Sequence, residues 1–264
     1  MTVTDAAAPL LTERIGAILR VTFNRPARLN AATREMEFAL RQVCAEVNNT
    51  PDIRVLVLQG ATGKKPAFMA GNDISEFEAL TSADDVRRTE STAEQTLAAI
   101  ENLRVPVVAC IDGAVVGQGA LLTACSDIVV AGPHVRFGFP IARTVGNCLS
   151  SLNLSRLTDM LGAPLTRAMI MRATLLDTAD LVRAGAVAAT STTHDALGAL
   201  GLRVAAEMAE LAPLTLSYTK RSMLHCRGEI TDNSQLVIDS YMSRDSREAV
   251  SAFLEKRSPQ WDGR

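Results

Sequence analysis

Two glycine-rich turns are the segments with the clearest capacity for chemistry. The first, GATGKKPAFMAGND (60–73), follows the apolar run IRVLVLQ, and the second, DGAVVGQGA (112–120), follows VPVVACI. Glycine lets a backbone approach a ligand closely, and the first amides of a helix have no intrahelical partner. Two such turns on adjacent strands could direct two N–H groups at one oxygen that gains negative charge. The alternative is that both are tight turns in which glycine serves backbone geometry alone.

Neither turn matches a nucleotide-binding motif. A Walker loop has four residues between its glycines, whereas Gly60 and Gly63 enclose two, and Lys65 stands where that motif has Ser or Thr. The glycines of the second turn do not have the GxGxxG spacing of a dinucleotide site. We therefore exclude a nucleoside triphosphatase of this type, and dinucleotide binding fits poorly.

Composition excludes further classes of protein. Of the 264 residues, 27 are Lys or Arg and 29 are Asp or Glu, giving a formal net charge of −2, and only 4% are aromatic. Such a chain lacks the basic surface and stacking side chains of a nucleic-acid-binding protein. The apolar stretch at 104–125 is interrupted by Asp112, Gln118 and three glycines. We therefore expect no membrane span.

Cysteine and histidine usage indicates a reducing environment. The five cysteines are scattered and the three histidines dispersed, without the spacing of a disulfide framework or a metal site. The first residues, MTVTDAAAPLLTER, have neither the basic nor the long apolar region of a secretory signal. We expect a cytoplasmic protein without a bound metal.

Hydrophobic periodicity predicts an α/β layer followed by a helical region. Apolar residues alternate over 14–24, which indicates a half-buried strand, and they recur at helical spacing after Thr33, a suitable N-cap. The stretch 61–73 is predicted to be a loop. Further strands are predicted at 53–60, 105–111, 127–132, 135–139 and 186–191, with helices between and after them. The chain then divides into a core at 1–200 and a helical C-terminal region at 201–264.

Six segments along almost the whole chain match one known family in order. They are NRPARLNA (24–31), AFMAGNDISEF (67–77), VPVVACIDGAVVGQGALLTACSDIVVA (105–131), FGFP (137–140), APLTLSYTKRSM (212–223) and EAVSAFLEKRSPQW (248–261). With these motifs the chain resembles the crotonase superfamily, also called the enoyl-CoA hydratase/isomerase family. The resemblance implies an α/β spiral of repeated ββα units with a C-terminal α-helical trimerisation region. It also implies an acyl-CoA thioester ligand and a homotrimer or a hexamer built as a dimer of trimers.

The same resemblance assigns residues to an oxyanion hole and to CoA. It places the oxyanion amides at Ala70 and Gln118, where two main-chain N–H groups would stabilise the thioester oxygen. CoA would contact Ala27, Leu29, Asp73, Ile74, Phe253 and Lys256, and no other cofactor is implied. Two of these residues also have ordinary structural interpretations. Asp73 is suited to capping a helix, and Lys256 could be a solvated charge on a helix.

The usual acid and base of the family are absent from the sequence. Hydratases of the family use two glutamates, one to activate water and one to exchange a proton. The motifs place these glutamates at Leu121 and Ile141, and both residues are aliphatic. The sequence therefore predicts oxyanion amides without the standard proton-transfer pair.

Three polar residues after FGFP are candidates to replace them. Cys148 near a helix start could act as a nucleophile or base, although a lone cysteine more often packs as a small apolar residue. Arg143 could hold an acidic acyl group, or form an ion pair at the surface. Asn147 lies between them in the sequence.

Two functions fit these observations. The first is an acyl-CoA-processing enzyme of fatty acid metabolism that acts through a thioester enolate, as a lyase or an isomerase, with only weak enoyl-CoA hydration. The alternative is a non-catalytic acyl-CoA-binding protein that keeps the fold, because two apolar replacements are what the loss of proton transfer would allow.

Overall fold

The computed structural model describes residues 8–226, 238 and 241–260. It opens with a hairpin, where the sequence predicted a single strand over residues 14–24. Strands β1 (Leu10–Ile15) and β2 (Ile18–Phe23) are antiparallel, with Ile15 opposite Ile18. Gly16 has a φ of +56°, so the chain reverses at a residue without a side chain to strain. The prediction was wrong because apolar alternation continues across the turn and conceals it.

The larger of two sheets has six strands, in the order β1-β2-β3-β5-β7-β9. After the hairpin all pairings are parallel. The remaining strands are β3 (Val55–Gly60), β5 (Val107–Ile111), β7 (Ile128–Ala131) and β9 (Ala189–Thr190). β3 and β5 are apolar throughout their buried parts because helices cover both faces of the sheet.

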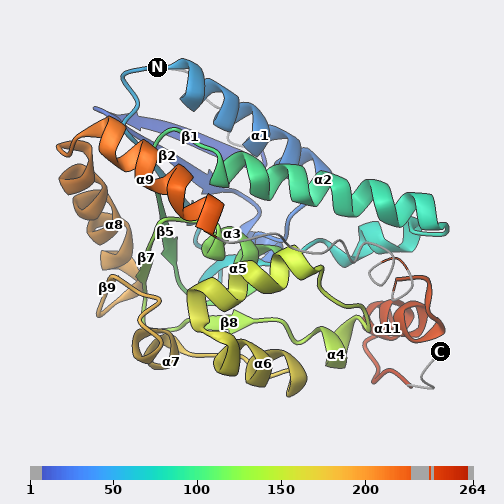
Figure 1. The fold of residues 1–264 in the computed structure, drawn as a ribbon. Helices are drawn as coiled ribbons and strands as arrows, with labels where there is room; N and C mark the ends of the chain where they lie inside the picture. The colour runs from blue at the N-terminus through green and yellow to red at the C-terminus, as the bar shows by residue number, and fades with distance from the viewer. Residues whose placement is uncertain (1–7, 227–237, 239–240, 261–264) are drawn as a thin grey trace.

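Alternate residues of these strands enter two different cores. Leu56 and Leu58 face the main core with helix α1 (Arg34–Asn49), whereas Val55 and Val57 face helix α8 (His194–Ala209). Thr33 caps α1 through a hydrogen bond from the Met36 amide, which confirms the predicted cap. In Figure 1, α1 and α2 (Ala83–Glu101) run side by side over one part of the sheet, and α8 lies apart from them.

A second, three-stranded sheet holds the glycine-rich turns. Its order is β4-β6-β8, all parallel, with bounds β4 (Ala67–Ala70), β6 (Ala114–Val116) and β8 (Arg136–Gly138). β4 was missed from the sequence because the glycines, lysines and proline around it indicate a loop. Each of its strands directly follows β3, β5 or β7 of the large sheet and precedes a helix. This repetition confirms the α/β fold of ββα units.

The remaining elements of the described chain are helices. They are α3 (Gln118–Ala124), α4 (Ile141–Thr144), α5 (Ser151–Leu161), α6 (Ala163–Met171), α7 (Thr178–Arg183), α9 (Pro213–Cys226) and α11 (Arg244–Leu254), with short 3-10 turns η1 (Pro26–Arg28) and η2 (Ile74–Ala79). The division predicted at residue 200 falls inside α8, which packs on the large sheet through both Leu197 and Ala205. The change from sheet-packed to peripheral helix therefore comes after Ala209. Within the described residues, no helix combines the length and apolarity needed to cross a membrane.

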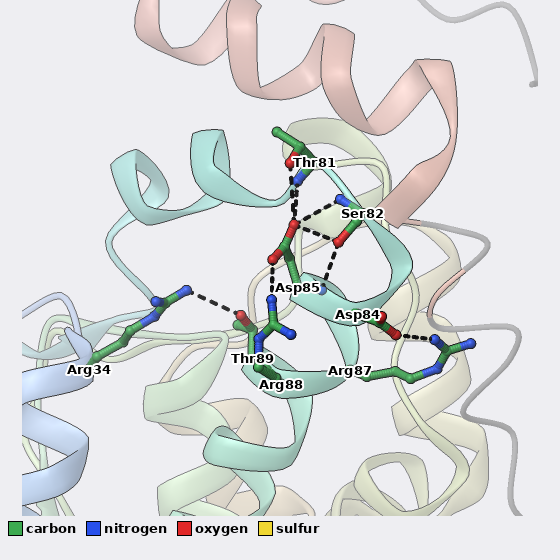
Figure 2. Close-up of polar contacts among 8 residues, drawn as sticks. All are labelled: Arg34, Thr81, Ser82, Asp84, Asp85, Arg87, Arg88 and Thr89. Atoms are coloured by element: carbon green, nitrogen blue, oxygen red, sulfur yellow. Dashed lines mark hydrogen bonds and ion pairs between the residues drawn. The ribbon is translucent and has the colours of Figure 1, made fainter.

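Helix α2 is fixed at both ends by polar contacts. At its start Ser82 and Asp85 form a capping box, and Asp85 also accepts a hydrogen bond from the Thr81 amide, as Figure 2 shows. Toward its end Glu94 and Glu101 bind Arg156 of α5, whose side chain is only 1% exposed.

Candidate active site

A cavity of about 540 Å³ lies where the small sheet meets α2, α4, α5 and the C-terminal helices. The ends of β4 and β6 form one wall, η1 and η2 a second, and the segment 139–149 a third. The lining is completed by Glu90 of α2, by Phe253 of α11 and by Tyr241, which precedes α11. The cavity therefore gathers segments that are more than 200 residues apart in the chain.

In the first glycine-rich turn, the amide predicted to act as an oxyanion donor is already hydrogen-bonded within the fold. The Ala70 amide donates to the Leu29 carbonyl at 3.0 Å, so its hydrogen is already used within the fold. The predicted oxyanion donor at Ala70 is therefore a wrong assignment. Two residues later, Asn72 forms a parallel β-bridge with Ala32. In this bridge the Ala32 amide donates to the Gly71 carbonyl, and the Asp73 amide donates to the Ala32 carbonyl. The Asn72 amide itself takes no part in that bridge, and Asn72 lines the cavity.

The second turn places Gln118, the other residue predicted to supply an oxyanion amide, at the start of a helix. Gly117 has φ +56° and ψ −119°, a conformation open to glycine but strained for other residues. It turns the chain from β6 into α3, whose first residue is Gln118. An amide at the first position of a helix has no intrahelical acceptor and lies at the positive end of the helix dipole. Gln118 also lines the cavity.

Close backbone packing holds the two turns together. Ala70 of β4 pairs with Val116 of β6, so the two strands end side by side. A Cβ added to Gly117 would lie 3.2 Å from the Gly71 Cα, and one added to Gly119 would lie 2.4 Å from the Met69 carbonyl oxygen. Glycine at these positions therefore allows two backbones to approach closely. This is the geometric role that the sequence offered as the alternative, and it is compatible with the oxyanion role.

Asn30 attaches the η1 loop to the small sheet and was not recognised from the sequence. Its side chain is fully buried, accepts from the Arg25 amide at 3.0 Å and donates to the Ala67 carbonyl at 2.8 Å. Asn30 also adopts a φ of +56°, which asparagine tolerates better than most residues. The only available signal was its place at the end of the NRPARLNA motif.

Four of the six residues predicted to contact CoA lie together in the lining of the cavity. Ala27, Leu29, Asp73 and Ile74 all line it. Asp73 also caps η2 through the Ser75 amide and binds Arg25 at 2.9 Å, which confirms its capping role. Burial alone would raise the pKa of Asp73, but the hydrogen bonds from Arg25 and Ser75 outweigh it and lower the pKa.

The structure places one of the two predicted C-terminal CoA contacts in the cavity lining. Phe253 lines the cavity although its side chain is 52% exposed. Lys256 follows the end of α11 with φ +55°, exposed and outside the cavity lining. A contact of Lys256 with this cavity in the same chain is therefore not seen.

Leu121 and Ile141 both lie in the cavity wall. Leu121 of α3 is 5% exposed and belongs to the main core, and Ile141 begins α4 and packs against that core. Neither side chain can accept or donate a proton. The part of the wall that they form is apolar.

The structure separates the three polar candidates that follow FGFP. Asn147 and Cys148 line the cavity, and Cys148 packs against the small apolar cluster that contains Tyr241. Arg143 is exposed on α4, donates to the Arg172 carbonyl at 3.3 Å and does not line the cavity. Of the two interpretations of Arg143, the exposed position on α4 agrees with a surface role, and contact with an acyl group gains no support.

Two further residues of the lining were missed from the sequence. Glu90 and Tyr241 are hydrogen-bonded to each other, and Tyr241 is also hydrogen-bonded to Asn147. Burial raises the pKa of Glu90, and Glu94 raises it further, although the Tyr241 hydrogen bond opposes the shift. No motif marks either residue, and they meet only because α2 and the C-terminal region pack together.

Comparison with known proteins gives one consistent family. Residues 13–264 match the family model described as enoyl-CoA hydratase/isomerase. The chain is 28% identical to the probable enoyl-CoA hydratase echA8 of Mycobacterium tuberculosis, over 97% of this chain and 98% of that protein. It is also 28% identical to the 2,3-dehydroadipyl-CoA hydratase of Escherichia coli, over 97% of this chain and 99% of that protein.

Solved structures agree on the fold. A methylmalonyl-CoA decarboxylase in complex with 2-nitronate-propionyl-CoA superposes with a TM-score of 0.86 at 22% identity, covering 97% of this chain and 98% of that chain. A putative enoyl-CoA hydratase/isomerase family protein from Hyphomonas neptunium superposes with a TM-score of 0.76 at 27% identity, covering 97% and 98%.

Proposed function

The chain belongs to the enoyl-CoA hydratase/isomerase family, and on that premise we propose that it processes an acyl-CoA thioester through an oxyanion-stabilised enolate. The observation that carries the proposal is the pair of amides at Asn72 and Gln118. Both belong to turns that end adjacent strands and touch each other, and both residues line one cavity.

The two amides would act on the thioester carbonyl oxygen. When the α-carbon loses a proton or is attacked, charge moves onto that oxygen, and fixed N–H groups stabilise it without rearrangement. Loss of one such donor costs about 3–4 kcal/mol of transition-state stabilisation in other enzymes. Because the donors belong to the main chain, the reaction depends on backbone shape at these turns more than on their side chains.

The rest of the cavity fits the parts of an acyl-CoA. Ala27, Leu29, Asp73 and Ile74 would contact CoA at the mouth, and Phe253 would cover it. The structural neighbour that carries 2-nitronate-propionyl-CoA supports an acyl-CoA in this fold. Lys256 would reach a CoA phosphate only in an assembly, which we propose to be a homotrimer or a dimer of trimers.

Hydration of a double bond would be weak. Leu121 and Ile141 occupy the positions proposed for the two usual glutamates, and neither can activate water. The same two residues favour a second candidate function, a protein that binds acyl-CoA without transforming it. Between enolate chemistry and binding alone, we propose enolate chemistry with proton exchange at the α-carbon, because Glu90 provides a carboxyl group in the cavity.

Two measurements on the wild-type protein test the proposal. The first is the dissociation constant for acetyl-, butyryl- and octanoyl-CoA, and the second is exchange of their α-hydrogens for deuterium in D2O. Binding with exchange supports enolate chemistry, and binding without exchange supports the second candidate. Failure to bind any of the three esters contradicts both. Efficient hydration of trans-2-enoyl-CoA would contradict the roles given to Leu121 and Ile141.

A further inference from the structure

We propose that Glu90 is the residue that transfers the proton at the α-carbon, held in place by Tyr241 and Asn147. This inference rests on the proposed function, since it names the acid–base group of the same site. It replaces the missing glutamates by a carboxyl from another element, helix α2.

Glu90 belongs to the inward face of α2. Val86, Leu97 and Ile100 are buried on this helix, and Ala93 lines the cavity. Positions 86, 90, 93, 97 and 100 follow the spacing of one helical face. Glu90 therefore places a carboxyl group on an otherwise apolar stripe, at the point where that stripe meets the cavity.

A chain of hydrogen bonds fixes the carboxyl group. The Asn147 side chain donates to the Tyr241 phenol, and the phenol donates to Glu90. Tyr241 is 8% exposed and stacks edge to face with Phe77, so the phenol is itself held by packing. A carboxylate that is held by one donor in a cavity wall retains lone pairs for a substrate proton.

Elimination among the lining residues also points to Glu90. Asp73 and Glu90 are the carboxyl groups in the described lining. Asp73 is bound by Arg25 and by Ser75, and it caps η2. Burial raises the pKa of Glu90 above its usual value, which brings the carboxyl closer to the pH at which a general base both accepts and returns a proton.

The proposed step balances without another reactant. The Glu90 carboxylate takes a proton from the α-carbon, so a C–H bond breaks and an O–H bond forms. The electron pair of that bond passes to the thioester oxygen as an enolate, held by the Asn72 and Gln118 amides. The Glu90 carboxylic acid then returns a proton to carbon, and exchange of that proton with D2O labels the product.

Glu90→Gln is the main variant, with Glu78→Gln as the matched control because Glu78 is exposed and does not line this cavity. The probes are acetyl-, butyryl- and octanoyl-CoA. We expect Glu90→Gln to slow α-deuteration by roughly 10²–10⁴-fold, with dissociation constants within about threefold of the wild type. Glu78→Gln should exchange at the wild-type rate. Glu90→Asp should recover part of the loss, because it restores a carboxyl group.

Tyr241→Phe tests the positioning role of the phenol. It also provides a second test of the proposal if Glu90→Gln does not fold. It should lower the exchange rate at saturation by about tenfold while leaving the dissociation constants unchanged. Wild-type exchange that persists in Glu90→Gln overturns the assignment of Glu90 and leaves the proposed function intact. Binding by the wild type without any exchange also overturns it. Absence of binding overturns the proposed function instead.

Discussion

At the residue scale, three glycines in the two turns allow the close backbone packing on which the proposed oxyanion hole depends. Gly71, Gly117 and Gly119 bring two backbones into contact beside the cavity that Asn72 and Gln118 line. The proposed oxyanion hole therefore depends on backbone geometry, and its sensitivity to mutation at these glycines should be steric.

Gly119→Ala tests this steric requirement. The new Cβ would meet the Met69 carbonyl oxygen at 2.4 Å, so α3 must move away from β4 and carry the Gln118 amide with it. We expect α-deuteration of acyl-CoA to fall by at least about 100-fold, since displacing one donor of this type has that effect. Gly198→Ala on α8 is the control, because its Cβ would make an ordinary contact at 3.6 Å. Equal exchange rates in both variants would argue against the two-turn oxyanion hole.

Glu37 gives a pH-dependent prediction. Burial raises its pKa from the usual 4.5 to about 7, against the opposing effect of Arg41. The folded state thus binds this proton more tightly than the unfolded state, so the free energy of unfolding falls as pH rises from about 4.5 to 7. Glu37→Gln should remove this fall and stabilise the protein at pH 8 by on the order of 2 kcal/mol, with little change at pH 4.

Urea unfolding at both pH values checks the Glu37 prediction. The exposed Glu46 lies on the same helix, so Glu46→Gln provides the control and should follow the wild-type profile. A Glu37→Gln variant less stable than the wild type at pH 8 would show that the ionised carboxylate is stabilised by its surroundings.

At the element scale, α2 is the helix on which the proposed site and the core both depend. A capping box, which Figure 2 shows, caps its first turn. Toward its other end, α2 binds Arg156 of α5. Between these ends the inward face brings Glu90 to the cavity. Rotation or fraying of α2 would therefore remove the carboxyl from the site.

Arg156→Met should destabilise the fold strongly. Glu101 is 7% exposed on its side chain and would lose the guanidinium group that it binds. Removal of one member of a buried ion pair typically costs about 3–5 kcal/mol. The triple variant Arg156→Met, Glu94→Gln and Glu101→Gln should recover most of that loss, because no uncompensated charge remains. Urea denaturation measures both, and a triple variant no more stable than the single one would contradict the electrostatic explanation.

At the scale of the whole molecule, the C-terminal helices are attached to the core yet leave apolar side chains outside. Lys220 of α9 binds Asp127 at 2.7 Å and the Ile100 carbonyl at 3.1 Å, which fixes α9 to the core. On the same helix Leu214 and Tyr218, one turn apart, are 63% and 57% exposed. Exposed apolar side chains on neighbouring turns are typical of surfaces that other subunits cover.

The proposed trimer predicts that this surface of α9 lies between subunits. Changing Leu214 and Tyr218 together to lysine should give monomers in size-exclusion chromatography with light scattering, with helical content retained in circular dichroism. Phe38→Lys is the control, since Phe38 is as exposed but lies on α1. A double variant with the wild-type mass would place the subunit contact elsewhere.

The amino-acid sequence by itself determined the family, the ββα repetition and the second glycine turn. The family followed from the order of the motifs, and the resemblance implied the ββα repetition. Local physics was enough for the Thr33 cap, the apolar strands and the GQG turn, because their residues act within a few positions of one another. It also identified the aliphatic residues Leu121 and Ile141, which do line the cavity.

Only the tertiary structure decided which groups meet in the cavity. The Ala70 amide does not fit its predicted role because Leu29, forty-one residues earlier, accepts its hydrogen. The Arg143 side chain is exposed on α4 and lies outside the cavity lining. Glu90 and Tyr241 gained theirs through packing between segments 151 positions apart. Hydrogen bonds and cavity walls are long-range properties, and no local pattern records which amide or carboxyl group is left available for a ligand.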